Sequence, residues 1–218
     1  MIQQDVFPDR ATAGRQLAEG VAALALPDPL VLALPRGGVA VAAPVAARLG
    51  APLDVLLVRK IGAPGFREFA VGAVVEGPAP IVVLDDTACA RAGADRAYID
   101  EQVDEATAEI ARRRARYAGG RRVAAVAGRS VVVVDDGIAT GATMRAALRA
   151  LRMGGAARVV VAVPVAPADT VAALRPLVDE VVCLSQPPAF RAVGLHYADF
   201  HQMEDDEVVA LLGVQGQA

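Results

Sequence analysis

Seven short apolar stretches, each about the length of a β-strand, constrain the fold of this 218-residue chain more than any other feature. Most are continuously apolar rather than alternating, which is typical of strands covered by other elements on both faces. They lie at 30–34, 53–58, 71–75, 81–84, 131–134, 159–163 and 180–184. Alanine-rich segments of helical length lie between them, at 9–25, 39–49, 143–153 and 168–177. The alternation predicts an α/β fold with a mainly parallel, twisted sheet flanked by helices.

The segment at about 94–120 has a different composition, rich in Glu and Arg, and its apolar residues recur at helical spacing. We expect one long amphipathic helix, inserted between strands of the sheet. Its four clustered arginines, at 112–114 and 116, are expected at a solvated helix end, where cations suit the helix dipole. A short closing helix is expected over 204–212. Because no linker or repeat interrupts the chain, we predict a single domain over residues 1–218.

The charge and hydropathy of the chain argue against several partners. The formal net charge is -3 and the isoelectric point about 5.4, so the composition predicts neither a nucleic-acid partner nor an anionic membrane surface. No apolar run reaches the roughly 18 to 20 residues of a membrane-spanning helix, and the first residues lack the pattern of a secretory signal. We therefore expect a cytoplasmic protein with Cys89 and Cys183 as reduced thiols.

The most informative segment is a predicted buried strand at 131–134 that ends in Asp135 and Asp136. A turn of small residues and a helix follow it. Such a turn directs backbone N–H groups and Thr hydroxyls at one phosphate, and the helix dipole favours that charge. The two carboxylates suit hydroxyl groups or a cation, so the pattern predicts a sugar phosphate with a nearby diol, together with Mg²⁺. A Walker A loop is excluded because residue 142 is Ala where that motif requires Lys.

This segment resembles the phosphoribosyl-pyrophosphate (PRPP) binding motif of type I phosphoribosyltransferases, and over nearly its full length the chain resembles bacterial members whose acceptor is undefined. The resemblance implies that Asp135 and Asp136 hold the ribose hydroxyls and belong to the catalytic residues. It implies that Mg²⁺ is held mainly through PRPP, so no metal ligand is assigned to the protein. The residues implied to wrap the 5-phosphate are Ala139, Thr140, Gly141, Ala142 and Thr143.

The same resemblance implies a pyrophosphate site in the loop after the first strand. Two glycines there allow close backbone approach, and the arginine offers a fork of donors to phosphate oxygens; these residues are Arg36, Gly37 and Gly38. Family members often hold this loop with a cis non-proline peptide. The stretch at 58–70 is expected to be a mobile loop that closes over PRPP, with Arg59 and Arg67 facing pyrophosphate. Lys60, the single lysine beside 21 arginines, is expected to be catalytic at the mouth of this site.

A C-terminal hood at about 185–203 gathers aromatic residues that suit a planar nitrogenous acceptor. The residues that we expect to contact the acceptor are Phe190, Val193, Tyr197 and Asp199. Enzymes of the family that act on 6-oxopurines carry an Asp where this chain has Ala139, which argues against hypoxanthine or guanine. The expected activity is Mg²⁺-dependent transfer of 5-phosphoribosyl to a small-molecule acceptor, and the alternative is a PRPP- or nucleotide-sensing regulator. Family members are commonly dimeric, so a homodimer is the assembly that the resemblance suggests.

Overall fold

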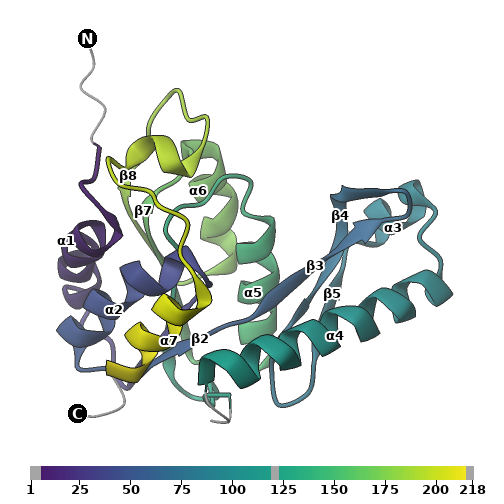
Figure 1. Cartoon of the computed structure of the whole chain (residues 1–218), viewed down its shortest axis with the longest axis horizontal. Coiled ribbons are helices and arrows are strands. Elements are labelled where there is room, and N and C mark those ends of the chain that lie inside the picture. The colour runs from purple at the N-terminus through teal and green to yellow at the C-terminus, as the bar shows by residue number, and fades with distance from the viewer. Residues whose placement is uncertain (1–5, 119–122, 215–218) are drawn as a thin grey trace.

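The main sheet contains five parallel strands in the order β2-β1-β6-β7-β8 (Figure 1). The computed structural model describes residues 6–118 and 123–214. The strands are β1 (Pro29–Ala33), β2 (Leu53–Val55), β6 (Ser130–Val134), β7 (Arg158–Val165) and β8 (Glu180–Ser185). The predicted mainly parallel sheet is therefore confirmed.

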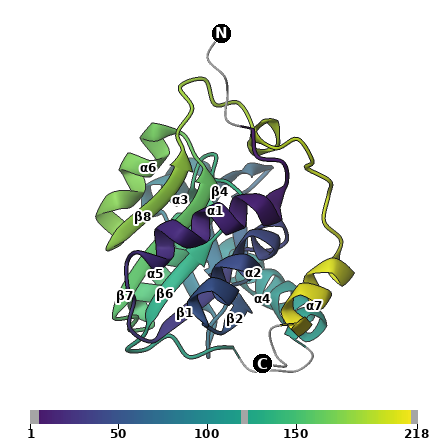
Figure 2. The ribbon, with the colours of Figure 1, turned by 90° about the vertical axis from the view of Figure 1, so that its left-hand side faces the viewer.

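Helices cover both faces of this sheet, which explains why its strands are apolar without alternation. Helices α1 (Arg10–Ala22) and α2 (Gly37–Leu49) lie on one face, in front of the sheet in Figure 2. Helices α5 (Ala142–Met153) and α6 (Ala168–Leu174), the latter extended by the 3-10 turn η1 (Arg175–Leu177), cover the other. Successive residues of β6 enter different cores: Val132 packs with α1 and α2, whereas Val133 packs with α5 and α6.

A second, antiparallel sheet in the order β3-β4-β5 is a departure from the prediction. It consists of β3 (Val58–Ala63), β4 (Phe66–Val75) and β5 (Ile81–Leu84). The stretch at 58–70, expected to be a loop, forms most of a β-hairpin, and the apolar runs at 71–75 and 81–84 do not join the parallel sheet. The glycines that suggested a loop lie within the hairpin. Gly62 is at a shift in the register between β3 and β4, and Gly65 is in the turn, with φ +72°.

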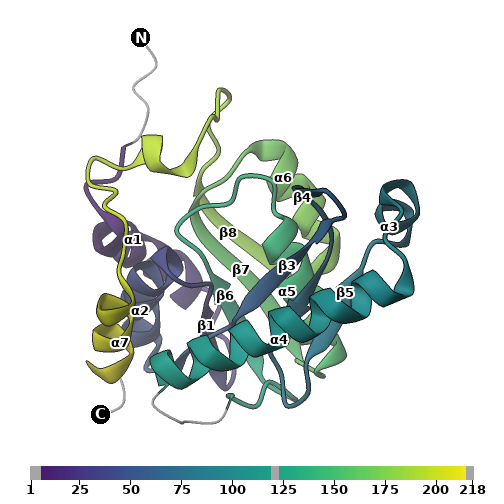
Figure 3. The ribbon, with the colours of Figure 1, turned by 45° about the vertical axis from the view of Figure 1, so that its right-hand side comes forward.

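Two helices follow the antiparallel sheet: α3 (Asp86–Ala92) and the long α4 (Arg96–Ala118), which runs along the sheet in Figure 3. A helix was predicted over 94–120, and its last two residues lie outside the described ranges. The expectation of a solvated arginine cluster was wrong for Arg114. This side chain is largely buried and donates hydrogen bonds to Asp54 at 2.6 Å, to both carboxylate oxygens of Glu76 and to the Val55 carbonyl.

The C-terminal part of the chain consists of the hood and a last helix. The hood contains the 3-10 turn η2 (Val193–His196), and helix α7 (Asp205–Val214) packs against α2 and α4. One hydrophobic cluster includes residues of both sheets, among them Val134 and Val71, so the two sheets share a core. Among the described residues, no helix is both long enough and apolar enough to cross a bilayer.

Candidate functional site

The site lies between β1 and β6 of the parallel sheet. The strand that follows β1 in the chain is added on one side of this pair, and the strand that follows β6 is added on the other. Strands β1 and β6 are neighbours, with Ala33 paired to Val134, but β1 leads on to β2 at one side and β6 leads to β7 at the other. In open α/β sheets, such a switch point leaves a crevice at the carboxyl ends of the strands. The loop at 35–38 follows β1 and the acid pair Asp135 and Asp136 follows β6, so both lie at this crevice.

The loop after β1 lies directly on the acid pair. A Cβ atom added to Gly37 would lie 1.9 Å from Asp136 Oδ2, and one added to Gly38 would lie 2.8 Å from the Val134 carbonyl oxygen. Neither position can accept a side chain without displacement of the loop or of the residue that it contacts. The Pro35–Arg36 peptide bond is cis, the geometry that the resemblance suggested. Two segments about 100 residues apart in sequence are thus brought into direct contact.

Asp136 is held by residues from both ends of the chain. Arg10 Nε donates to Asp136 Oδ2 at 2.8 Å, and Arg10 Nη1 donates to the His201 carbonyl at 2.9 Å. The Arg10 guanidinium also lies 3.9 Å from the ring centroid of Phe200. Tyr197 donates its hydroxyl proton to the Asp136 carbonyl at 2.5 Å. No local pattern links residue 10 to residue 136, so the role of Arg10 was not predicted from the sequence.

Asp135 has different surroundings from its neighbour. Its Oδ1 accepts a hydrogen bond from the Asp136 backbone N–H at 2.9 Å. Burial, and secondarily the nearby charge of Asp136, raise the pKa of Asp135 well above the ordinary value of a carboxyl group. The pair therefore combines one carboxylate that has a cationic partner with one that lacks it and is costly to ionise.

Two side chains hold the turn before α5 by donating hydrogen bonds to its carbonyl groups. Thr170 Oγ1 donates to the Ala139 carbonyl and Arg145 Nη1 donates to the Thr140 carbonyl, each at 2.8 Å. Gly141 takes the left-handed conformation with φ +73°, and α5 begins at the next residue. The first N–H groups of a helix have no intrahelical partner, so the predicted phosphate-binding residues 139–143 surround a helix N-terminus. Thr170 and Arg145 were not anticipated from the sequence.

The predicted pyrophosphate residues fall into separate places. Arg59 lines a small cavity together with Pro35 and Thr143, next to the loop after β1. Lys60 is the next residue of the same strand, so its side chain leaves on the opposite face, and it lines a different cavity together with Arg145 and Arg149. Arg36 Nη1 lies 3.7 Å from Glu204 and 3.8 Å from Asp205, at the start of α7. The described structure therefore brings Arg59, but not Lys60, to a cavity shared with the loop.

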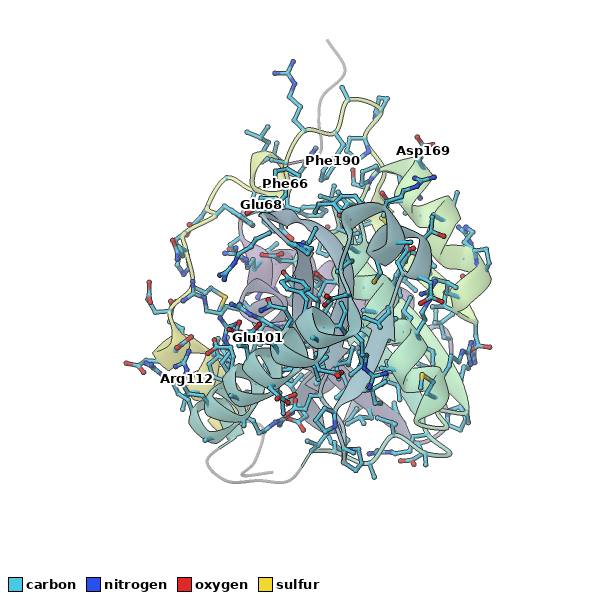
Figure 4. All side chains as sticks on the ribbon, turned by 90° about the vertical axis from the view of Figure 1, so that its right-hand side faces the viewer. Phe66, Glu68, Glu101, Arg112, Asp169 and Phe190 are labelled. Atoms are coloured by element: carbon cyan, nitrogen blue, oxygen red, sulfur yellow. The ribbon has the colours of Figure 1, made fainter. Side chains whose placement is uncertain are left out.

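Arg67 lies near the tip of the hairpin, beside Phe66 and Glu68, which Figure 4 labels. The tip exposes large apolar surface: Phe66 is 64% exposed and Phe69 is 44% exposed. Because most of the Phe66 side chain stays in contact with water, its ring gains little free energy from burial.

The hood reaches the crevice through Val193. A Cβ added to Gly137 would lie 2.5 Å from Val193 Cγ1, so the residue after the acid pair must be small for the hood to pack there. Phe190 stacks on His196 with ring centroids 5.3 Å apart, and burial lowers the pKa of His196. Tyr197 is only 5% exposed, and its hydroxyl holds Asp136 through the hydrogen bond to the Asp136 carbonyl. Asp199 is exposed, and its carboxylate accepts from the His201 backbone N–H at 3.2 Å.

The arrangement defines an α/β protein in which three features meet at one switch point. They are the turn at 139–143 before α5, the acid pair Asp135 and Asp136, and the glycine loop at 35–38. The family model for the phosphoribosyl transferase domain matches residues 11–199. The chain belongs to this family.

Named relatives agree with this assignment. Two Mycobacterium tuberculosis proteins, from strains CDC 1551 and H37Rv and each named "Putative phosphoribosyl transferase", are 48% identical over 207 residues. The match covers 95% of this chain but 46% of each relative, so the chain spans about half the length of these curated relatives. The crystal structure of TT1426 from Thermus thermophilus is 50% identical, covers 95% of this chain and 97% of its own, and superposes with a TM-score of 0.84.

Proposed function

We propose that the protein transfers the 5-phosphoribosyl group of PRPP to a nitrogenous small-molecule acceptor and releases pyrophosphate, with Mg²⁺ as cofactor. The observation that supports this most directly is the contact between Gly37 and Asp136, because it sets a candidate pyrophosphate loop against a candidate diol site. PRPP carries its pyrophosphate on C1, adjacent to the ribose diol. The spacing of these two elements therefore matches the order of groups on that molecule.

Each part of PRPP has a proposed partner. The turn at 139–143 would bind the 5-phosphate through backbone N–H groups and the hydroxyls of Thr140 and Thr143. Asp135 and Asp136 would accept hydrogen bonds from the ribose hydroxyls. Pyrophosphate would lie against the loop at 36–38 and against Arg59, displacing the acids of α7 from Arg36.

The residues present fit a Mg²⁺ ion held mainly through its ligand. Among the described residues, no group of three or more His, Cys, Asp or Glu side chains could form a protein-only cage. Asp136 is already neutralised by Arg10, whereas Asp135 is not, so the pair could share a cation with PRPP oxygens without forming a complete ligand set. When bound, the ion would neutralise charge on the departing pyrophosphate.

The proposed reaction inverts the configuration at C1. The bond from C1 to the pyrophosphate oxygen breaks, and the acceptor nitrogen forms the new bond from the opposite face. Positive charge develops on the ribose as pyrophosphate leaves, so fixed donors at the leaving group lower the barrier. Water would capture such a centre, which gives the hairpin at 58–70 a proposed role as a cover.

The acceptor would lie under the hood. Val193 packs at the acid pair, and Phe190 offers a flat apolar surface nearby. Asp199 is exposed and available to an N–H group of a heterocycle, whereas Tyr197 would act on the acceptor only through the position of Asp136. We keep a planar nitrogenous heterocycle as the proposed acceptor class.

The test is to incubate the protein with PRPP and Mg²⁺ against a panel of nucleobases and related heterocycles, and to measure pyrophosphate release. Acceptor-dependent release that is lost in the Asp135→Asn/Asp136→Asn double variant would support the enzyme. PRPP binding without turnover on any acceptor would favour a PRPP-sensing regulator, and the absence of PRPP binding would contradict both.

The proposed catalytic role of Lys60 has its own test. Lys60→Arg should reduce turnover more than Arg112→Lys on the exposed face of α4, because a guanidinium does not reproduce the compact charge of an ammonium. Equal effects would remove Lys60 from the catalytic set.

A further inference from the structure

A basic cleft lies between α5 and the antiparallel sheet, on the side of β3 that faces away from Arg59. We use this name for the cavity lined by Lys60, Arg145, Arg149 and Asp85, together with the small residues Gly72 and Ala73 of β4. Its volume is about 130 Å³, which is several times the share of one water molecule in the liquid, about 30 Å³. The cleft is therefore large enough for a small polyatomic ion.

The cations of the basic cleft outnumber its acidic side chains. Over residues 6–118 and 123–214, none of Lys60, Arg145 and Arg149 forms an ion pair. Arg145 donates only to a neutral acceptor, the Thr140 carbonyl. This contrasts with α4, where Arg112 and Arg113 share Glu109. Three cations line the cavity beside the single carboxylate of Asp85, so they repel one another, and an anion between them would relieve that repulsion.

The carboxylate of Asp85 also lines the cleft, so a ligand that fits it should carry a hydrogen-bond donor as well as an anionic group. Asp85 Oδ1 accepts from the Ala88 backbone N–H at 2.9 Å and so caps α3, which leaves its other oxygen able to accept another hydrogen bond. A ligand that combines a phosphate with a hydroxyl or amino group would satisfy both the cations and this oxygen.

The basic cleft is separate from the proposed 5-phosphate site. The α5 residues that line it are spaced as one helix face: Ala142, Arg145, Ala146 and Arg149. Thr143 lies on another side of the helix and lines the cavity shared with Pro35 and Arg59. Arg149 is seven residues beyond Ala142, which is a rise of about 10 Å along the helix. A phosphate held at the first turn of α5 would not also lie beside Arg149.

We propose that the basic cleft is a second anion site, which binds the phosphate group of a phosphorylated small molecule between Lys60, Arg145 and Arg149. The arginines supply forked donors to phosphate oxygens, and the lysine supplies a compact charge. This inference competes with the catalytic role proposed for Lys60 and does not depend on the transferase reaction itself, since the cleft shares only Lys60 and Ala142 with the groups assigned to PRPP.

The sequence offers a reporter for this site, because Lys60 is the single lysine of the chain. Protein labelled with ¹³C-lysine gives one ε-methylene signal, and inorganic phosphate is the probe. We expect a saturable shift of this signal, with a Kd that changes less than twofold when PRPP and Mg²⁺ are added at saturation. We expect Arg149→Gln to weaken phosphate binding about tenfold, as for loss of one charge-assisted contact, without changing PRPP turnover.

Arg152→Gln, on the same helix but paired with Asp179, is the matched control and should leave the Kd unchanged. Loss of the phosphate-induced shift on addition of PRPP would assign Lys60 to the active site and overturn the proposal. An unchanged Kd in Arg149→Gln would also overturn it. If PRPP does not bind at all, the titration without PRPP still tests the cleft, so its outcome is distinct from failure of the transferase.

Discussion

Asp135 and Asp136 are adjacent residues for which we predict opposite effects on stability. Asp135 is half-buried and has a raised pKa, so its ionised form costs free energy in the folded state. Asp135→Asn should therefore raise the midpoint of denaturation at pH 8. Since the wild-type carboxyl is ionised only above its raised pKa, the advantage of Asn should shrink as the pH falls through that value. Urea denaturation across a pH series would measure both effects.

Asp136→Asn should instead destabilise the fold, because it leaves the buried Arg10 without a charged partner. Loss of one member of a buried ion pair typically costs about 3 to 5 kcal/mol. Both variants should lose PRPP turnover. Equal stability of the two variants at pH 8 would contradict this account of the pair.

Gly37 is required by contact rather than by turn conformation. In Gly37→Ala the new methyl group would start 1.9 Å from Asp136 Oδ2, so either the loop at 35–38 or the Asp136 side chain must move. We expect the KM for PRPP to rise at least about tenfold, which is a loss of about 1.4 kcal/mol. Gly213→Ala is the control, since nothing lies within 4 Å of the added atom and the residue is helical. Steady-state kinetics with unchanged parameters in Gly37→Ala would exclude the contact.

Arg114 provides the buried ionic contact among those that attach helix α4 to the rest of the molecule. Arg114→Met should cost about 3 to 5 kcal/mol, because Asp54 and Glu76 would be left buried without a counter-charge. Arg112→Met, two residues earlier and on an exposed side chain, should change stability by less than about 1 kcal/mol. Urea denaturation of the two variants would compare them directly. Similar losses would mean that the arginine cluster acts as a general surface charge.

The exposed aromatic rings at the tip of the hairpin of β3 and β4 are predicted to act on catalysis while contributing little to stability. Phe66→Ser and Phe69→Ser remove exposed rings, so the free energy of unfolding should change by less than about 0.5 kcal/mol. If the tip covers the site, acceptor-dependent turnover should fall and PRPP hydrolysis without acceptor should rise. Met153→Ser, at a residue 71% exposed on α5, is the control for loss of surface apolar area. A hydrolysis-to-transfer ratio equal to that of the wild type would rule out the cover.

At the scale of elements, the sequence predicted those structures that depend on residues close together in the chain. The order of strand, acid pair, turn and helix at 131–153 is contiguous, so its period and small residues indicate its structure directly. The hairpin was missed because Gly62 and Gly65 suggest a loop, although one marks a register shift and the other a two-residue turn. Arg114 was indistinguishable from its neighbours because its acidic partners, Asp54 and Glu76, come from distant strands. Arg10 was missed for the same reason.

At the scale of the whole molecule, the site joins three segments that are far apart in sequence. Binding of PRPP with Mg²⁺ should therefore slow amide hydrogen exchange together at 35–39, 58–70 and 135–143. Strand β8, on the far edge of the sheet, should be unaffected. Hydrogen exchange followed by mass spectrometry would measure this. Protection at 139–143 alone would mean that the glycine loop and the hairpin do not contact the ligand.

The anchoring of Asp136 by both ends of the chain has a consequence for biosynthesis. Arg10 leaves the ribosome before Asp136, and Tyr197, Phe200 and His201 leave it after Asp136. The parallel sheet can assemble on the nascent chain as its strands emerge, but the acid pair gains its full set of contacts only after residue 201 is free. A stalled chain that ends before the hood would therefore hold a sheet with an incomplete site, and competence to bind PRPP would arise only after the hood has left the ribosome.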